Sequence, residues 1–197
     1  MSVYTFAPGY TLSQNYPFVS WTDTFSDEQL KNIVEYLDTL PKEPGTVHGG
    51  NDNGAVRKSS VAWVSNDSPQ ASELYDRMAF IARSINSKFF GFDLFGFVED
   101  MQYTVYEGNE QGHYTWHMDF SDTSPSSRKL TLVLQLSSPE DYEGGELQTL
   151  TSYNEQTIDK KLGLVAAFPS WTLHRVTPVT KGIRKTLVIW VAGPQFR

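Results

Sequence analysis

Two histidines and one aspartate could together hold a metal ion. His117 and Asp119 lie two positions apart, and His174 follows in a later segment with strand-like composition. In extended backbone, side chains two residues apart project to the same side, so His117 and Asp119 converge, and an antiparallel neighbour could add His174. Two imidazoles and one carboxylate form the facial triad that suits non-haem Fe(II) and leaves coordination positions open for substrate chemistry. Because the chain has no cysteine, its metal ligands must be nitrogen and oxygen.

An arginine ten residues beyond His174 could bind an anion beside that metal. Arg184 shares one face of a predicted strand with Thr186, Val188 and Trp190. A guanidinium on the inward face of a strand needs an anionic partner. A dicarboxylate that binds the metal at one end and Arg184 at the other, through a forked charge-assisted pair, would meet that need. The co-substrate indicated is 2-oxoglutarate.

Other residues near these segments could contact a ligand. One of two alternating sets must line the interior of the protein, either Thr131, Val133 and Gln135 or Leu130, Leu132 and Leu134. Trp116 flanks His117 and is either a stacking platform for a substrate or a packing residue of the sheet. His48, Arg57 and Ser59 lie in or next to a glycine-rich loop, where a structural role is favoured over contact with a substrate.

The elements that must position these residues fall into two runs. Apolar residues at helical spacing predict one helix from the Ser26 cap to Pro41 and a second from Ser68-Pro69 to Ile85. Short segments rich in β-branched and aromatic residues then predict strands over 97–106, 129–136, 146–150, 162–168, 174–178 and 186–191. Residues 41–58 predict a long surface loop of the kind that closes over ligands, and the Gly144-Gly145 pair predicts an exposed turn. The pattern indicates an α+β fold, mainly β, with an antiparallel sandwich or barrel supported by helices on one sheet.

Length and charge narrow the class of protein. At 197 residues the chain is expected to form one domain over 1–197, with helical support in 1–95 and a β core in 96–194. The formal net charge of −7 argues against a partner held by phosphate neutralisation, so no nucleic acid is expected. The first residues lack a basic and an apolar region, and no apolar run is long enough to span a bilayer, so a cytoplasmic protein without a membrane partner is expected. The sequence does not reveal the oligomeric state.

At these residues the chain resembles the Fe(II)/2-oxoglutarate dioxygenases, and within them the prolyl 4-hydroxylase-like branch of small bacterial and viral hydroxylases. The resemblance is carried by residues 106–119, 128–147 and 168–190, and the two helices also look like that branch's supporting helices. It implies a distorted double-stranded β-helix, a cupin-like jelly roll, with the metal at its open mouth. It also implies that O2 and 2-oxoglutarate are converted to succinate and CO2 while an unactivated C–H bond is hydroxylated, with ascorbate as a candidate further cofactor.

The resemblance also implies roles for single residues. The catalytic iron ligands would be His117, Asp119 and His174, and Arg184 would bind the distal carboxylate of 2-oxoglutarate. The further residues that it places at the co-substrate are Tyr106, Thr131, Gln135 and Trp190. Those that it places near the prime substrate are Tyr114 and Arg128, to which Trp116 is added as a stacking candidate.

Several functions remain open at this point. The leading hypothesis is hydroxylation of an aliphatic carbon, most plausibly of a prolyl residue in a peptide or protein. A free amino-acid or other small-molecule hydroxylase differs from this only in how the pocket closes, which sequence does not show. Nucleic-acid demethylation is disfavoured because the alkylation-repair relatives carry a second arginine where this chain has Trp190. A non-catalytic jelly-roll binding module is disfavoured because all three candidate ligands and Arg184 are present.

Overall fold

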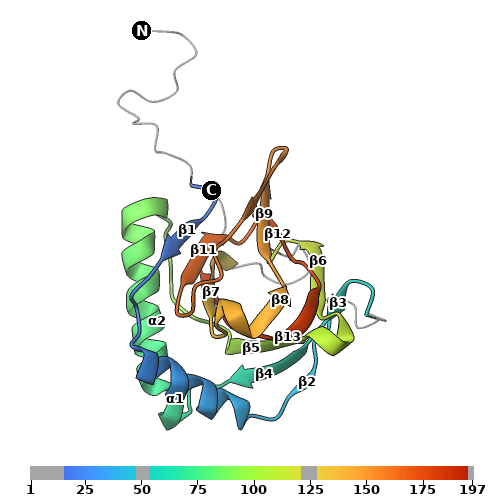
Figure 1. The fold of residues 1–197 in the computed structure, drawn as a ribbon. Coiled ribbons are helices and arrows are strands. Elements are labelled where there is room, and N and C mark those ends of the chain that lie inside the picture. The colour runs from blue at the N-terminus through green and yellow to red at the C-terminus, as the bar shows by residue number, and fades with distance from the viewer. Residues whose placement is uncertain (1–15, 48–53, 121–127, 195–197) are drawn as a thin grey trace, which may run out of the picture.

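The computed structural model describes residues 16–47, 54–120 and 128–194, and it is mostly β. Within these residues the strands form two antiparallel sheets (Figure 1). The large sheet has the order β1-β11-β7-β13-β5-β4-β2, with β8 paired to β13, and the small sheet has the order β10-β9-β12-β6-β3. His48 and residues 121–127 lie outside the described residues, so the structure does not place them.

The large sheet contains β1 (Val19–Trp21), β2 (Glu43–Pro44), β4 (Ser60–Val64), β5 (Met101–Glu107), β7 (Arg128–Gln135), β8 (Tyr142–Gly144), β11 (Val165–Pro169) and β13 (Val179–Ala192). The small sheet contains β3 (Arg57–Lys58), β6 (His113–His117), β9 (Leu147–Thr151), β10 (Asn154–Thr157) and β12 (Leu173–Val176). Short 3-10 turns cover Pro69–Ala71, Gly108–Glu110 and Pro139–Asp141, and a π turn covers Asn86–Phe90. The six predicted strand regions are all found, shifted by a few residues at their ends.

Strands from the first half of the chain belong to both sheets, so the sheets do not begin at residue 96 as expected. The strand β4 (Ser60–Val64) pairs with β5 along its whole length, from Ser60 opposite Val105 to Val64 opposite Met101. β1 extends the large sheet at the opposite edge, next to β11. The β core therefore includes segments that lie on either side of the two helices in the sequence.

The two helices form where the apolar spacing predicts them. In α1 (Asp27–Asp38), the Ser26 hydroxyl accepts the Gln29 backbone N–H, and the Gln29 side chain accepts the Ser26 N–H, which is a complete capping box. α2 (Ser72–Ile85) begins later than Ser68-Pro69, because that pair instead opens the 3-10 turn before it. Gly91 ends the π turn after α2 with a positive φ of 66°, a conformation that glycine adopts without strain.

The two faces of the large sheet meet different surroundings. One face carries Leu130, Leu132 and Leu134 of β7 and packs in a single apolar cluster with buried residues of α1 and α2, such as Leu37 and Met78. Figure 1 shows both helices on this outer side of the curved sheet. The other face looks toward the small sheet, and the space between the two sheets holds the polar residues of the site. No helix in the described ranges is long and apolar enough to cross a membrane.

The two faces of β13 carry different kinds of residue, as predicted. Leu187, Ile189 and Val191 lie in the apolar cluster with the helices, whereas Arg184, Thr186, Val188 and Trp190 line a cavity between the sheets. The strand is longer than predicted because Gly182, with a positive φ of 72°, lets the chain turn onto β8 without ending the pairing. Arg184 therefore lies in the middle of a strand that is held on both sides by hydrogen bonds.

Candidate active site

The two histidines are brought together by direct strand pairing. β6 and β12 are antiparallel neighbours in the small sheet, and His117 is the register partner of His174. Their ring centroids lie 4.1 Å apart. Asp119 follows β6 by two residues, and its backbone N–H donates to the Ser170 carbonyl at 2.9 Å, which holds the turn beside β12.

The three side chains can converge on one ion. Nε2 of His117 lies 3.9 Å from Oδ1 of Asp119, and Nε2 of His174 lies 3.6 Å from Oδ2. All three ligand atoms lie within 4.8 Å of one another. Two ligands bound at about 2.1 Å to the same metal are at most about 4.2 Å apart, so the carboxylate already lies within bridging reach of both imidazoles.

Backbone hydrogen bonds fix the tautomer of both imidazoles. Nδ1 of His117 lies 2.8 Å from the Thr115 carbonyl, and Nδ1 of His174 lies 2.9 Å from the Thr172 carbonyl. Because a carbonyl oxygen only accepts, each Nδ1 must carry the hydrogen and donate it. In a neutral imidazole Nε2 then carries the lone pair, which is the form that binds a metal, and both Nε2 atoms lie toward Asp119.

The charge states of the ligands also suit a cation. Burial raises the pKa of the Asp119 carboxyl, but His174, His117 and the Thr131 hydroxyl hydrogen bond outweigh this, so its pKa lies below the ordinary value. Burial and the neighbouring His174 lower the pKa of His117. At neutral pH the site therefore presents an ionised carboxylate and a neutral His117 imidazole, which are the protonation states needed for metal binding.

Thr131 lines the cavity between the sheets, whereas Gln135 is buried and is not among the residues that line it, and each bonds to a protein group. The Thr131 hydroxyl donates to Oδ2 of Asp119 at 2.8 Å and lies 3.1 Å from the Ser170 hydroxyl. The Gln135 carbonyl accepts a hydrogen bond from Arg184 at 2.9 Å, while its amide donates to the Tyr142 hydroxyl. Both side chains thus orient the groups that would bind the metal and the anion.

Arg184 is a buried cation that faces the metal ligands from the opposite sheet. Only 1% of the residue is exposed, and within the described residues no carboxylate lies within ion-pair distance of its guanidinium. Its Nε has no hydrogen-bond partner there. Tyr106, its register partner on β5, places its ring 5.4 Å from the guanidinium carbon. A buried guanidinium without a counter-ion is expected to bind an anionic ligand.

Gly145 is buried beside this arginine, although the sequence indicates an exposed turn. Its φ is +62°, and a side chain built on it would place Cβ 3.0 Å from Cδ of Arg184. The turn folds under the sheets because β8 pairs with β13, a contact between segments far apart in the sequence. Sequence analysis therefore missed Gly145 as a residue that makes room for the Arg184 side chain.

Arg128 and Trp190 lie at the mouth of the cavity. The Arg128 guanidinium carbon lies 3.7 Å from the centroid of the Trp190 ring, and the same guanidinium forms a forked pair with the Glu99 carboxylate. Only 7% of Trp190 is exposed, and its indole N–H has no partner within the described residues. Glu99 was not singled out from the sequence, because nothing local links it to an arginine 29 residues away.

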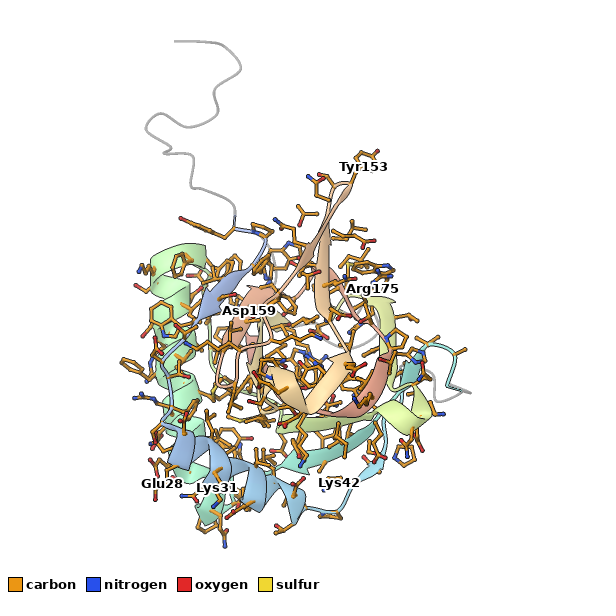
Figure 2. The ribbon with its side chains drawn as sticks, viewed as in Figure 1. Glu28, Lys31, Lys42, Tyr153, Asp159 and Arg175 are labelled. Carbon is orange, nitrogen blue, oxygen red and sulfur yellow. The ribbon has the colours of Figure 1, made fainter. Side chains whose placement is uncertain are left out.

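Tyr114 lies in the cavity, but Trp116 does not. The Tyr114 ring stacks on the His117 imidazole with a centroid separation of 3.5 Å. Trp116 directly precedes His117 in an extended strand, so it projects to the other face of the small sheet. There it contacts Arg175, whose guanidinium carbon lies 4.5 Å from its ring; Figure 2 labels Arg175 on the side of the molecule away from the helices. The expectation that Trp116 is a stacking platform in the site is therefore wrong.

A cavity of about 600 Å³ lies between the two sheets, a volume typical of small-molecule sites. Its inner end is lined by the three metal-binding candidates and Arg184, and its outer part by Glu43, Thr46, Trp63, Glu99, Met118 and Arg128. Trp63 and Met118 are about half exposed. The cavity thus has a polar, charged interior and a wider mouth with apolar side chains.

The donor groups fit Fe(II) with 2-oxoglutarate. Two neutral nitrogen ligands and one carboxylate on one side of an ion leave positions for a chelating ligand, and the unpartnered Nε of Arg184 can take a carboxylate across the cavity. His117, Asp119 and His174 would hold the metal, and Arg184 would hold the far end of the dicarboxylate.

Comparisons with known proteins agree with this arrangement. Residues 101–192 match the model of the 2OG-Fe(II) oxygenase superfamily. A PKHD-type hydroxylase of Xanthomonas campestris pv. campestris is 27% identical over 177 residues, which cover 86% of this chain and 75% of the relative.

Two solved structures show the same fold. A prolyl hydroxylase from Trichoplax adhaerens, in complex with a hypoxia inducible factor oxygen degradation domain peptide fragment, has a TM-score of 0.75 and 16% identity, over 90% of this chain and 84% of that one. A Pseudomonas putida prolyl-4-hydroxylase has a TM-score of 0.70 and 17% identity, over 91% of this chain and 94% of that one. Residues 101–192, which match the superfamily model, contain all three metal-binding candidates and Arg184, and the chain is therefore a 2-oxoglutarate-dependent hydroxylase of the 2OG-Fe(II) oxygenase superfamily.

Proposed function

We propose that the protein hydroxylates a prolyl residue within a peptide or protein, with iron bound by His117, Asp119 and His174. The observation that carries the co-substrate part is Arg184, a buried guanidinium that faces the His-Asp-His group and that, within the described residues, donates a side-chain hydrogen bond only to the neutral Gln135. When bound together, Fe(II), 2-oxoglutarate and O2 supply the oxidant for an unactivated C–H bond.

The residues of this chain would bind and orient the reacting groups. The backbone carbonyls at Thr115 and Thr172 hold the imidazoles with Nε2 free, and Thr131 holds the Asp119 carboxylate. Arg184 and Tyr106 would fix the distal carboxylate of 2-oxoglutarate, and the Trp190 indole N–H would meet an acceptor near the mouth. These contacts would orient the co-substrate and fix the direction from which a substrate approaches.

A peptide substrate is supported by the shape of the cavity. Its outer part is open and is lined by the half-exposed side chains of Trp63 and Met118. Apolar side chains beside an open cleft are suited to contact the ring and flanking residues of a proline-containing segment. The peptide bound to the Trichoplax adhaerens protein supports the same class of substrate.

The test measures succinate release from 2-oxoglutarate with Fe(II), in the presence of a series of proline-containing peptides or of free amino acids. Peptides are expected to stimulate release, and free proline is not. Stimulation by free amino acids alone would replace the peptide proposal with a small-molecule hydroxylase. The use of ascorbate as a further cofactor stays a prediction. Leaving ascorbate out of the same assay tests whether it is needed to sustain turnover.

A further inference from the structure

A stack of two rings lies beside the metal-binding candidates. The rings of Tyr114 and His117 are 3.5 Å apart at their centroids and inclined by only 13°. In a regular strand, residues three apart point to opposite faces and cannot stack. β6 allows the contact because it contains a bulge: His117 pairs with His174 and Tyr114 with Val176, so three steps along β6 match two along β12. Bulges of this kind re-aim a side chain beside a site.

Arg57 holds the other side of the Tyr114 ring. Its guanidinium carbon lies 4.8 Å from the ring centroid, and since the imidazole covers one face, the guanidinium contacts the face that remains. Arg57 is itself fixed by hydrogen bonds to Ser59 at 2.9 Å, Gln102 at 2.8 Å and the Thr46 carbonyl at 3.3 Å. Because 93% of its surface is buried, the guanidinium is a rigid backing for the ring.

The stack restrains the plane of the His117 ring, which the hydrogen bond of His117 does not. The bond from Nδ1 to the Thr115 carbonyl selects the tautomer, but a single hydrogen bond lets the imidazole tilt about that contact. A ring packed face to face against it restricts the tilt, and so keeps Nε2 directed at Asp119. His174 has its own ring contact, with Phe168 at 4.7 Å.

We propose that Tyr114 is a positioning residue for the metal, which holds the plane of the His117 ring and is itself held by Arg57. This inference rests on the proposed function only in that the site binds a divalent cation. With both ring faces covered, only the edge and hydroxyl of Tyr114 are left for a substrate. Its main effect is therefore on metal affinity, before any co-substrate binds.

The experiment titrates the purified protein with Mn(II) alone and follows free Mn(II) by electron paramagnetic resonance. Loss of outer contacts to a metal-binding histidine typically weakens metal binding by about 10- to 100-fold. Tyr114→Leu and Tyr114→Met, which lack a ring, are expected to bind Mn(II) at least about tenfold more weakly. Tyr114→Phe keeps the ring and is expected to restore the affinity of the parent protein.

Trp116→Leu is the matched control, because it removes the aromatic ring next to His117 on the outer face and should leave Mn(II) affinity unchanged. Circular dichroism shows which variants are folded. A folded Tyr114→Leu or Tyr114→Met protein that binds Mn(II) as tightly as the parent overturns the proposal, as does an equal loss in Tyr114→Phe.

If neither ring-free variant folds, Arg57→Met decides, because it keeps Tyr114 and removes its backing, together with the hydrogen bonds of Arg57 to Ser59, Gln102 and the Thr46 carbonyl. A weaker affinity for Mn(II) in that variant supports the positioning role, and an unchanged affinity overturns it. Failure of the parent protein to bind Mn(II) would instead count against the proposed function, so the two failures are distinguishable.

Discussion

Replacement of Arg184 by methionine is expected to move protein stability and co-substrate affinity in opposite directions. Arg184 is 1% exposed, and its Nε has no partner among the described residues. Exchange of a buried charge for an apolar side chain of similar length is neutral or stabilising by about 1–4 kcal/mol. Some of this gain is offset because the Gln135 carbonyl loses its donor, so we expect a net gain of about 1–2 kcal/mol without ligands. This gain corresponds to a melting temperature higher by about 2–8 °C for a chain of this size.

The same substitution should remove the partner of the 2-oxoglutarate distal carboxylate. Truncation of one member of a buried, hydrogen-bonded charge pair costs about 2–5 kcal/mol, which is a loss in affinity of about 30- to 3,000-fold. The parent protein gains about 2.7 kcal/mol of stability when 2-oxoglutarate is present at about 100 times its dissociation constant. Arg184→Met should gain at most about 0.9 kcal/mol at that concentration.

The assay is thermal unfolding with Mn(II), without and with 2-oxoglutarate. The variant should melt above the parent protein without 2-oxoglutarate, and 2-oxoglutarate at about 100 times the parent's dissociation constant should stabilise it by no more than about a third as much as the parent. Arg175→Met is the control, because Arg175 pairs with Gln148 and Glu155 on the outer face of the small sheet. It should keep the full response to 2-oxoglutarate. An Arg184→Met protein that responds like the parent would refute the assignment of Arg184 to the co-substrate.

Three further predictions concern stability and metal dependence. Thr149 is fully buried, and its hydroxyl has no hydrogen-bond partner among the residues that the structure describes, so Thr149→Val should raise the free energy of unfolding in urea by about 1 kcal/mol, and a loss would show that the hydroxyl is bonded. Burial raises the pKa of Asp38, but hydrogen bonds from Lys185 and Tyr103 outweigh this and lower it. The stability from this depressed pKa is present above the ordinary carboxyl pKa and is lost as the pH falls through the folded value. Asp38→Asn should therefore cost about 0.5–1 kcal/mol near neutral pH and almost nothing at a pH of about 2, and a pH-independent difference would contradict this. A chelator should abolish succinate release, and Fe(II) should restore it in the parent protein but not in His174→Ala; restored turnover in that variant would exclude His174 as a ligand.

The parts of the fold in which apolar residues recur at a regular spacing could be predicted from the sequence. The alternation of Thr131 and Val133 with Leu130 and Leu132 determines which face of β7 is apolar, and the same holds for β13. Helical spacing likewise predicts α1 with its Ser26 cap. These features are local, so neighbouring residues suffice to specify them.

Features that depend on strand pairing could not be predicted. The Glu99–Arg128 pair joins the segment before β5 to the first residue of β7, and Gly145 reaches Arg184 only because β8 pairs with β13. The bulge in β6 brings Tyr114 to the face of His117, against the simple alternation that correctly moves Trp116 away. The sequence also gave no sign that β4 lies between β5 and β2 in the large sheet.

The most direct test of the central claim is the mass of a proline-containing peptide after incubation with the protein, Fe(II), 2-oxoglutarate and isotopically heavy O2. The account predicts one heavy oxygen atom on the peptide's prolyl residue and one in the succinate released, in equal amounts, with neither formed by Asp119→Ala. Succinate release without any labelled peptide would leave the co-substrate site intact but contradict peptide hydroxylation. Labelled products from Asp119→Ala in the yield of the parent protein would contradict the metal site itself.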